Sequence, residues 1–136
     1  MESKNSYFTP NIEDMRVGYE CEANPKFYSE QEDVWSPIIM KGIGQEVIHY
    51  HSLGVYRTPY LTKEQIEAEG RKIKTDNNNG VIDFEKTNYL LLSWNYTLKI
   101  IEINDGKTTT RFDNQLYRGR CKDINTFRYI CKLLGI

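Results

Sequence analysis

No apolar run in this sequence of 136 residues is long enough to cross a membrane as a helix, which takes about eighteen residues or more. We therefore expect no membrane span. The opening MESKNSYFTP also lacks the apolar stretch of a secretory signal. Together these absences predict a protein of the cytoplasm.

Cysteine is scarce, and the spacing of the three cysteines does not suggest a disulfide, a metal site or a catalytic nucleophile. Cys21, Cys121 and Cys131 make an odd count without any CxxC spacing, which predicts reduced thiols. Cys21 alternates with apolar Val17 and Tyr19, and Cys131 lies on the apolar side of the predicted last helix. We expect all three to be structural residues, although a cysteine and histidine pair is formally available.

The sequence also lacks the motifs GxxxxGK[ST], GxGxxG and GxSxG, which bind phosphates or present a nucleophilic serine. Glu20 and Glu22 share one face of a predicted strand, but nothing in the sequence indicates the pocket that acid–base catalysis requires. We expect a protein that is not an enzyme and that has no cofactor.

His49 and His51 are weak candidates for metal ligands. On the strand predicted there, both imidazoles would point the same way and could chelate a metal with a third ligand. No cysteine pair, HExxH motif or carboxylate cluster accompanies them. The sequence therefore predicts no metal site.

The formal net charge of −1 and the pI near 6.1 exclude the strongly basic class of nucleic-acid binders. The charge is unevenly distributed, because residues 1–35 carry eight acids and three bases whereas residues 107–136 carry seven bases and two acids. Two interpretations stay open: the two segments lie together and partly neutralise each other, or they form separate binding faces.

Aromatic residues are abundant, with ten tyrosines and two tryptophans. Tyr and Trp are common both in the packing of β-sheets and at binding interfaces. Some of these side chains are expected at the surface.

The periodicity predicts a single α+β domain over residues 1–136, mostly an antiparallel sheet with two helices, the C-terminal helix packed on one face. A capping-box spacing starts the first helix at Thr62, with Ile66 and Ile73 on its apolar side, and Asp123 and Gly135 bound the second. Pro37 restricts its strand to an edge or entry position, because proline lacks the N–H that the ladder needs. Strands are expected within 9–22 and at 35–40, and the segments 46–50 and 55–60 are expected as two strands or as one bent strand broken at Gly54. Further strands are expected within 89–103, with a bulge or a bend near Ile100 and Ile101, at 107–112 after an Asn104-Asp105-Gly106 turn, and at 115–121.

The strongest candidate for a binding site is the run Tyr117-Arg118-Gly119-Arg120. It places two guanidinium groups on one strand face beside an aromatic ring, a combination that binds phosphates and acidic partners. The alternative is that both arginines pair with Glu20 and Glu22. We include Arg16, from the polar face of the first predicted strand, among the candidate binding residues.

Three stretches of sequence resemble small uncharacterised proteins of tailed phages and prophages of Bacteroides-type bacteria. They are TPNIED followed by RVGYE, VYR followed by YLTKEQIE, and YRGR followed by FRYICKLLGI. The resemblance implies a phage protein that acts in the cytoplasm of a bacterial host. It implies no reaction, cofactor or catalytic residue.

Three functions are compatible with these features. The first is a non-enzymatic phage accessory protein that binds a host or phage macromolecule, such as a defence protein that it inhibits. The second is a protein that sequesters an anionic nucleotide through Arg118 and Arg120 with a stacking tyrosine. The third is a minor virion or assembly component.

Overall fold

The computed structural model describes residues 7–27, 29–42, 44–87, 90–105 and 115–136. The chain divides into two compact units, Met1–Tyr60 and Leu61–Ile136, each with its own cluster of buried apolar side chains. Both units combine an antiparallel sheet with α-helix, which confirms the predicted α+β class. The expectation of one domain over the whole chain stays a prediction.

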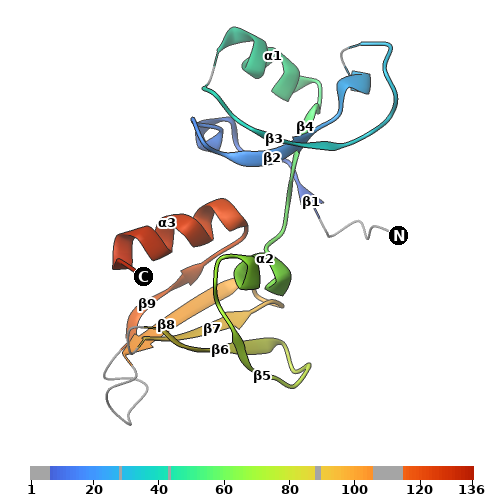
Figure 1. Ribbon diagram of the computed structural model, residues 1–136. Helices are drawn as coiled ribbons and strands as arrows, with labels where there is room; N and C mark the ends of the chain where they lie inside the picture. The colour runs from blue at the N-terminus through green and yellow to red at the C-terminus, as the bar shows by residue number, and fades with distance from the viewer. Residues whose placement is uncertain (1–6, 28, 43, 88–89, 106–114) are drawn as a thin grey trace. The chain divides into compact units, whose positions relative to one another are not determined.

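The first unit contains a four-stranded antiparallel sheet in the order β1-β4-β2-β3, with one helix packed against it (Figure 1). Val47 and Tyr50 of this helix pack against the core beside Cys21 and Val55. The elements are β1 (Tyr7–Phe8), β2 (Glu20–Ala23), β3 (Ser36–Ile39), α1 (Gln45–Ser52) and β4 (Tyr56–Pro59), with short 3-10 helices at Ile12–Asp14 and Pro25–Phe27.

Strand β3 lies at an edge of this sheet, as Pro37 predicts. The backbone N–H of Met40 donates to the carbonyl of Tyr19 at 2.8 Å. Because alternate residues of an antiparallel strand point their N–H groups to the same side, the nitrogen of Pro37 faces away from β2. The missing donor of Pro37 therefore leaves the ladder between β2 and β3 intact.

Two predictions for the first unit are wrong. The segment 46–50 was expected as a strand, but it is part of helix α1, because Val47 and Tyr50 are three residues apart and reach the core from one side of a helix. The first strand was expected to include Val17 on its apolar face, yet Val17 is 76% exposed. Gly18, with φ of +90°, turns the chain there, so β2 begins only at Glu20.

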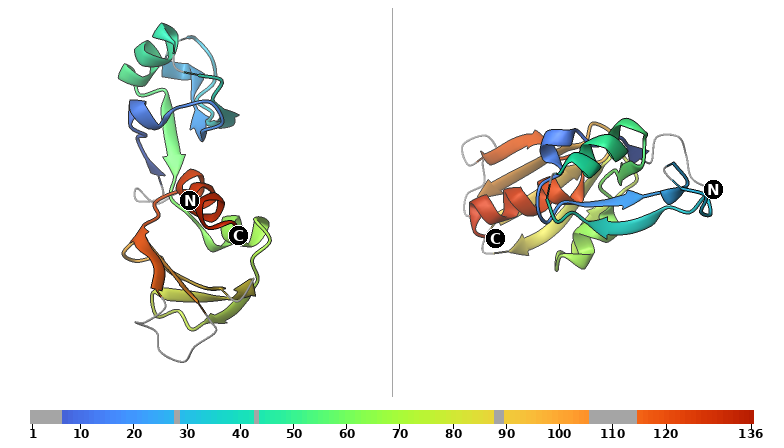
Figure 2. Two further views of the ribbon diagram at one scale, coloured as in Figure 1. Left: turned by 90° about the vertical axis from the view of Figure 1, so that its left-hand side faces the viewer. Right: turned by 90° about the horizontal axis from the view of Figure 1, so that it is seen from above.

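The second unit is a five-stranded antiparallel meander in the order β5-β6-β7-β8-β9. Two helices lie on the same side of this sheet (Figures 1 and 2). The elements are α2 (Lys63–Ala68), β5 (Ile73–Asp76), β6 (Val81–Thr87), β7 (Leu90–Asn95), β8 (Ile100–Asp105), β9 (Gln115–Arg120) and α3 (Ile124–Leu134).

Both predicted helix starts are confirmed. Thr62 and Gln65 form a reciprocal capping box at α2, with hydrogen bonds of 3.2 and 3.1 Å. Asp123 accepts the backbone N–H of Thr126 at 3.2 Å at the start of α3, and Gly135 ends that helix with φ of +67°. Phe127 and Ile130 of α3 belong to the buried cluster, which confirms that the C-terminal helix packs on the sheet.

Three predictions for the second unit are wrong. Ile73 was expected on the first predicted helix, but α2 ends at Ala68 and Ile73 begins β5. The segment 89–103 was expected as one bulged strand, whereas β7 and β8 form a hairpin with their own turn. Asn104 and Asp105 were expected in a turn and belong to β8; the strand expected at 107–112 lies outside the described residues.

The described residues therefore contain three α-helices where the sequence predicts two. None of them is long and apolar enough to span a membrane.

Candidate functional site

Arg57 occupies the centre of the first sheet, on the face that points away from the core. Its neighbours in β4, Tyr56 and Thr58, are buried, so alternation directs Arg57 to the opposite face. Glu22 of β2 lies directly across from it, and Arg57 Nε donates to Glu22 Oε1 at 2.7 Å. Only 16% of the Arg57 side chain and 22% of the Glu22 side chain are exposed, which strengthens this charged hydrogen bond.

Two aromatic rings lie close to this guanidinium group. Its Cζ lies 3.6 Å from the ring centroid of Tyr7 and 4.3 Å from that of Trp35, within the range of cation–π contact. Trp35 contacts Phe27 at 5.9 Å between ring centroids, and Lys26 Nζ lies 5.7 Å from the Phe27 ring. We call these five residues the stacked row: Tyr7, Arg57, Trp35, Phe27 and Lys26.

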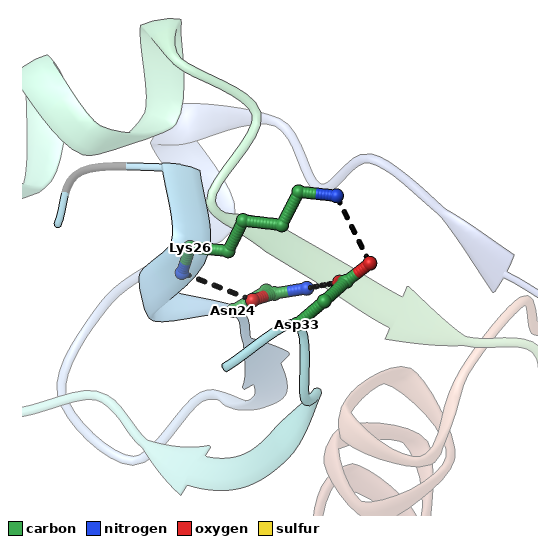
Figure 3. A network of polar contacts seen from close by, with 3 residues as sticks. All are labelled: Asn24, Lys26 and Asp33. Atoms are coloured by element: carbon green, nitrogen blue, oxygen red, sulfur yellow. Dashed lines mark hydrogen bonds and ion pairs between the residues drawn. The ribbon is translucent and has the colours of Figure 1, made fainter. Parts of the chain in front are cut away.

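A small polar network anchors the Lys26 end of the stacked row (Figure 3). Asn24 is fully buried; its Nδ2 donates to Asp33 Oδ1 at 2.6 Å, and its Oδ1 accepts the backbone N–H of Lys26 at 3.1 Å. Lys26 Nζ donates to Asp33 Oδ2 at 2.9 Å. The hydrogen bond from Lys26 and then the one from Asn24 lower the pKa of Asp33.

The stacked row has the composition of a protein-binding surface. Tyr, Trp and Arg are the residue types that contribute most to binding energy at interfaces. The ring of Phe27 within the row is 42% exposed, and Val34, which precedes Trp35 in the sequence, is 48% exposed. The arrangement offers aromatic area beside two cations, Arg57 and Lys26, that are already paired with carboxylates. Such a surface suits recognition of a protein better than bond breaking.

The cysteines have environments that suppress nucleophilic chemistry. Burial, reinforced by nearby Glu22, raises the pKa of Cys21 to about 12. Burial also raises the pKa of Cys121 and of Cys131. All three therefore remain neutral thiols near pH 7.

The two histidines do not share a face, contrary to the prediction. They lie two residues apart in helix α1, so their side chains are separated by about 200° around the helix axis. His51 Nε2 forms a hydrogen bond of 2.6 Å with the carbonyl of Pro10. In the described part of the chain, no group of three or more His, Cys, Asp or Glu side chains is arranged to hold a metal ion.

Arg118 and Arg120 lie on one exposed face of β9, as the alternation predicts. Tyr117 does not join them, because it points to the other face and packs against the core cluster. Glu102 of β8 lies directly across from Arg118, so the exposed face carries both signs of charge. The structure thus separates the tyrosine from the two arginines.

The remaining candidates from the sequence have local partners. Glu22, expected as a partner of Arg118 or Arg120, is paired with Arg57. Arg16 is exposed, and its Nε donates to the carbonyl of Glu13 at 3.2 Å within the turn before β2.

Arg57, Trp35 and Tyr7 are not among the site residues predicted from the sequence. A usable signal exists for Arg57, since it is the one charged residue in the apolar run 55–60 and alternation sets it opposite Tyr56 and Thr58. The contact of Tyr7 with Arg57 depends on the pairing of β1 with β4, and that of Trp35 depends on the pairing of β3 with β2 and of β2 with β4. These are long-range contacts that no local pattern predicts.

Comparisons with protein-family models, with curated protein sequences and with solved structures gave no match.

Proposed function

We propose that this chain is a non-enzymatic accessory protein that binds another protein through the stacked row. The observation that carries the proposal is the contact of the Arg57 guanidinium with the rings of both Tyr7 and Trp35, continued by the half-exposed ring of Phe27. Such a rigid aromatic surface loses little conformational entropy when it is covered by a partner.

Charge favours a protein over a nucleic acid as the partner. Residues 1–60 carry nine acids and five bases, so the unit that holds the stacked row repels phosphate backbones. A basic protein surface is complementary to it and would be steered toward it. The neutral thiols and the separated histidines support a role without catalysis.

The resemblance of three sequence stretches to phage and prophage proteins supplies the setting of this proposal. In that setting the partner is a protein in the cytoplasm of a bacterial host, and a defence protein that the chain inhibits is the case of most interest.

The test is affinity capture from a bacterial lysate with the parent protein and with a Phe27→Ser variant. Phe27 lies at the partly exposed end of the stacked row, so its replacement removes binding area while the core stays intact. We expect a captured protein that is lost with Phe27→Ser. The matched control is Tyr129→Ser, an aromatic side chain of the second unit that is 62% exposed, which should retain the captured protein.

Equal capture by the parent and the Phe27→Ser variant would contradict the proposal. So would the absence of any protein captured by the parent beyond those captured by a bare support.

A further inference from the structure

A cavity of about 240 Å³ lies in the second unit between the segment that follows α2 and one side of α3. Its volume corresponds to on the order of eight water molecules, at about 30 Å³ for each. Three cationic side chains contribute to its lining, with a phenyl ring, a thiol and one side-chain carboxylate: Arg71, Arg128, Lys132, Phe127, Cys131 and Glu69. Ile136, the last residue of the sequence, completes the lining.

Arg71 is the unusual member of this cavity. It is only 9% exposed, although a guanidinium group is costly to remove from water without a charged partner. Its Nη2 donates to Cys131 Sγ at 3.7 Å, which is a weak hydrogen bond to sulfur. Among the described residues, no carboxylate lies at ion-pair distance from Arg71.

The neighbouring groups do not neutralise Arg71. Burial raises the pKa of Cys131 more than the attraction of Arg71 lowers it, so the acceptor is a neutral thiol and not a thiolate. Glu69 is already paired, because its Oε1 accepts from Arg128 Nε at 2.5 Å. The negative end of the α3 dipole favours cations and accounts for Lys132 in the last turn. Among the described residues, no buried nitrogen of Arg71 lacks a hydrogen-bond partner, so the guanidinium nitrogens that do not bond Cys131 remain open to the cavity.

The side chains that line the cavity therefore have a formal excess of two positive charges, from Arg71 and Lys132, once the pair of Glu69 with Arg128 is set aside. A phosphoryl group carries a charge of about −1.5 to −2 at neutral pH and three acceptor oxygens. Its geometry also matches the planar fork of an arginine, which can donate two parallel hydrogen bonds to it.

We propose that this cavity binds a phosphoryl group, carried by inorganic phosphate or by a small phosphate monoester. Arg71 forms the floor of the site and donates to two phosphoryl oxygens, while Lys132 contributes a second positive charge at the rim. This site belongs to the second unit, and its occupation does not depend on the stacked row or on the partner proposed for it.

The first experiment measures binding of inorganic phosphate and of glycerol phosphate to the full chain by calorimetry and thermal melting at constant ionic strength. We expect saturable binding of phosphate at millimolar concentration and a melting temperature that rises with phosphate but not with acetate. Tighter binding of glycerol phosphate would support the proposal and assign a monoester as the ligand, and equal or weaker binding would support it with inorganic phosphate as the ligand. No saturable binding of either compound overturns it.

The second experiment locates the binding with substitutions. Arg71→Gln should weaken phosphate binding by about tenfold or more, because a charge-assisted pair of hydrogen bonds is lost. Lys132→Gln changes an exposed side chain, so it should fold like the parent and weaken binding several-fold. If Arg71→Gln does not fold, phosphate binding by Lys132→Gln tests the site: weaker binding than the parent supports it, and unchanged binding overturns it.

The matched control is Arg118→Gln, which removes an exposed arginine of the same unit outside the cavity. We expect phosphate binding by Arg118→Gln to equal that of the parent. A loss as large as that of Lys132→Gln would show diffuse attraction of anions by the surface and would overturn the proposed site. Because capture of a partner protein is assayed separately with Phe27→Ser, failure of one proposal leaves the other intact.

Discussion

Asn24 holds a loop that has little regular structure of its own. Its backbone N–H donates to the carbonyl of Val55 at 2.9 Å, and its amide bonds both Lys26 and Asp33. A buried amide must find such partners, because an unsatisfied one is costly. Asn24, together with the ion pair of Lys26 and Asp33, therefore holds described residues of a segment that the sequence shows only as a loop.

We predict that Asn24→Ala lowers the free energy of unfolding by about 1–3 kcal/mol, the usual cost when a buried hydrogen-bonding group loses its partner. Chemical denaturation measures the change. The control is Asn11→Ala, which alters an exposed asparagine with no side-chain cap bond and should shift stability by less than about 0.5 kcal/mol. Equal effects of the two substitutions would show that the buried network contributes nothing.

The carboxyl group of Asp33 gives a prediction about pH. Its pKa is lowered in the folded chain, so the stabilisation from this group is present above its ordinary pKa and is lost as the pH falls through the folded value. Lys26→Met removes the largest cause of the shift. We expect the pKa of Asp33, followed by NMR, to rise in that variant and to stay below its ordinary value, because the hydrogen bond from Asn24 remains. An unchanged pKa would contradict this assignment.

At the scale of elements, the apolar face of α3 that the sequence predicts is the face that packs on the sheet. Its apolar residues recur at helical spacing, and the same face packs on the sheet, with Phe127 only 1% exposed. Tyr129, two residues further on, points away and is 62% exposed. One helix thus offers a buried and an exposed aromatic residue for comparison.

We predict that Phe127→Ala lowers the free energy of unfolding by about 3–5 kcal/mol, since it removes a buried ring and leaves a cavity. Tyr129→Ala should change it by less than about 0.5 kcal/mol. Urea denaturation of both variants measures the difference. Melting of Phe127→Ala within a degree or two of the parent would mean that α3 does not contribute to the core.

The sequence could predict the helices whose first residues include a side chain that caps the helix. The capping box at Thr62 and the cap at Asp123 mark α2 and α3, because those side chains satisfy backbone N–H groups locally. Helix α1 has no such signal. It begins at Gly44 without a side-chain cap, and its short sequence has no fully buried residue.

The hairpin of β7 and β8 was missed because its turn contains neither glycine nor proline. Asn95 Oδ1 instead accepts the backbone N–H groups of Thr97 and Leu98 at 3.1 and 2.9 Å, and Lys99 adopts a left-handed φ of +58°. A lysine in that conformation is uncommon and cannot be predicted from composition. The candidate site was missed for a related reason, since its rings come from strands that are distant in the sequence.

At the scale of the whole molecule, each unit carries one tryptophan, Trp35 in the first and Trp94 in the second. Trp94 is fully buried in the same cluster as Phe127. We predict that Phe127→Ala shifts the unfolding midpoint reported by Trp94 more than the midpoint reported by Trp35. Fluorescence of Trp35→Phe and Trp94→Phe variants, each with and without Phe127→Ala, isolates the two signals.

Coincident shifts of the two signals would contradict that prediction and would mean that both clusters unfold as one cooperative domain, as the sequence indicates. Separate shifts would mean that each unit unfolds by itself, which its own core makes possible.

The buried thiols have a consequence for the chemical behaviour of the folded chain. With a pKa of about 12, only about one Cys21 side chain in 10⁵ is ionised at pH 7, so alkylating reagents find almost no thiolate to attack. Modification must therefore wait until the surrounding structure opens, and its rate reports how often that happens. Cys21 lies in one unit, and Cys121 and Cys131 lie in the other. The alkylation rates of their peptides therefore report the opening of each unit separately within one sample.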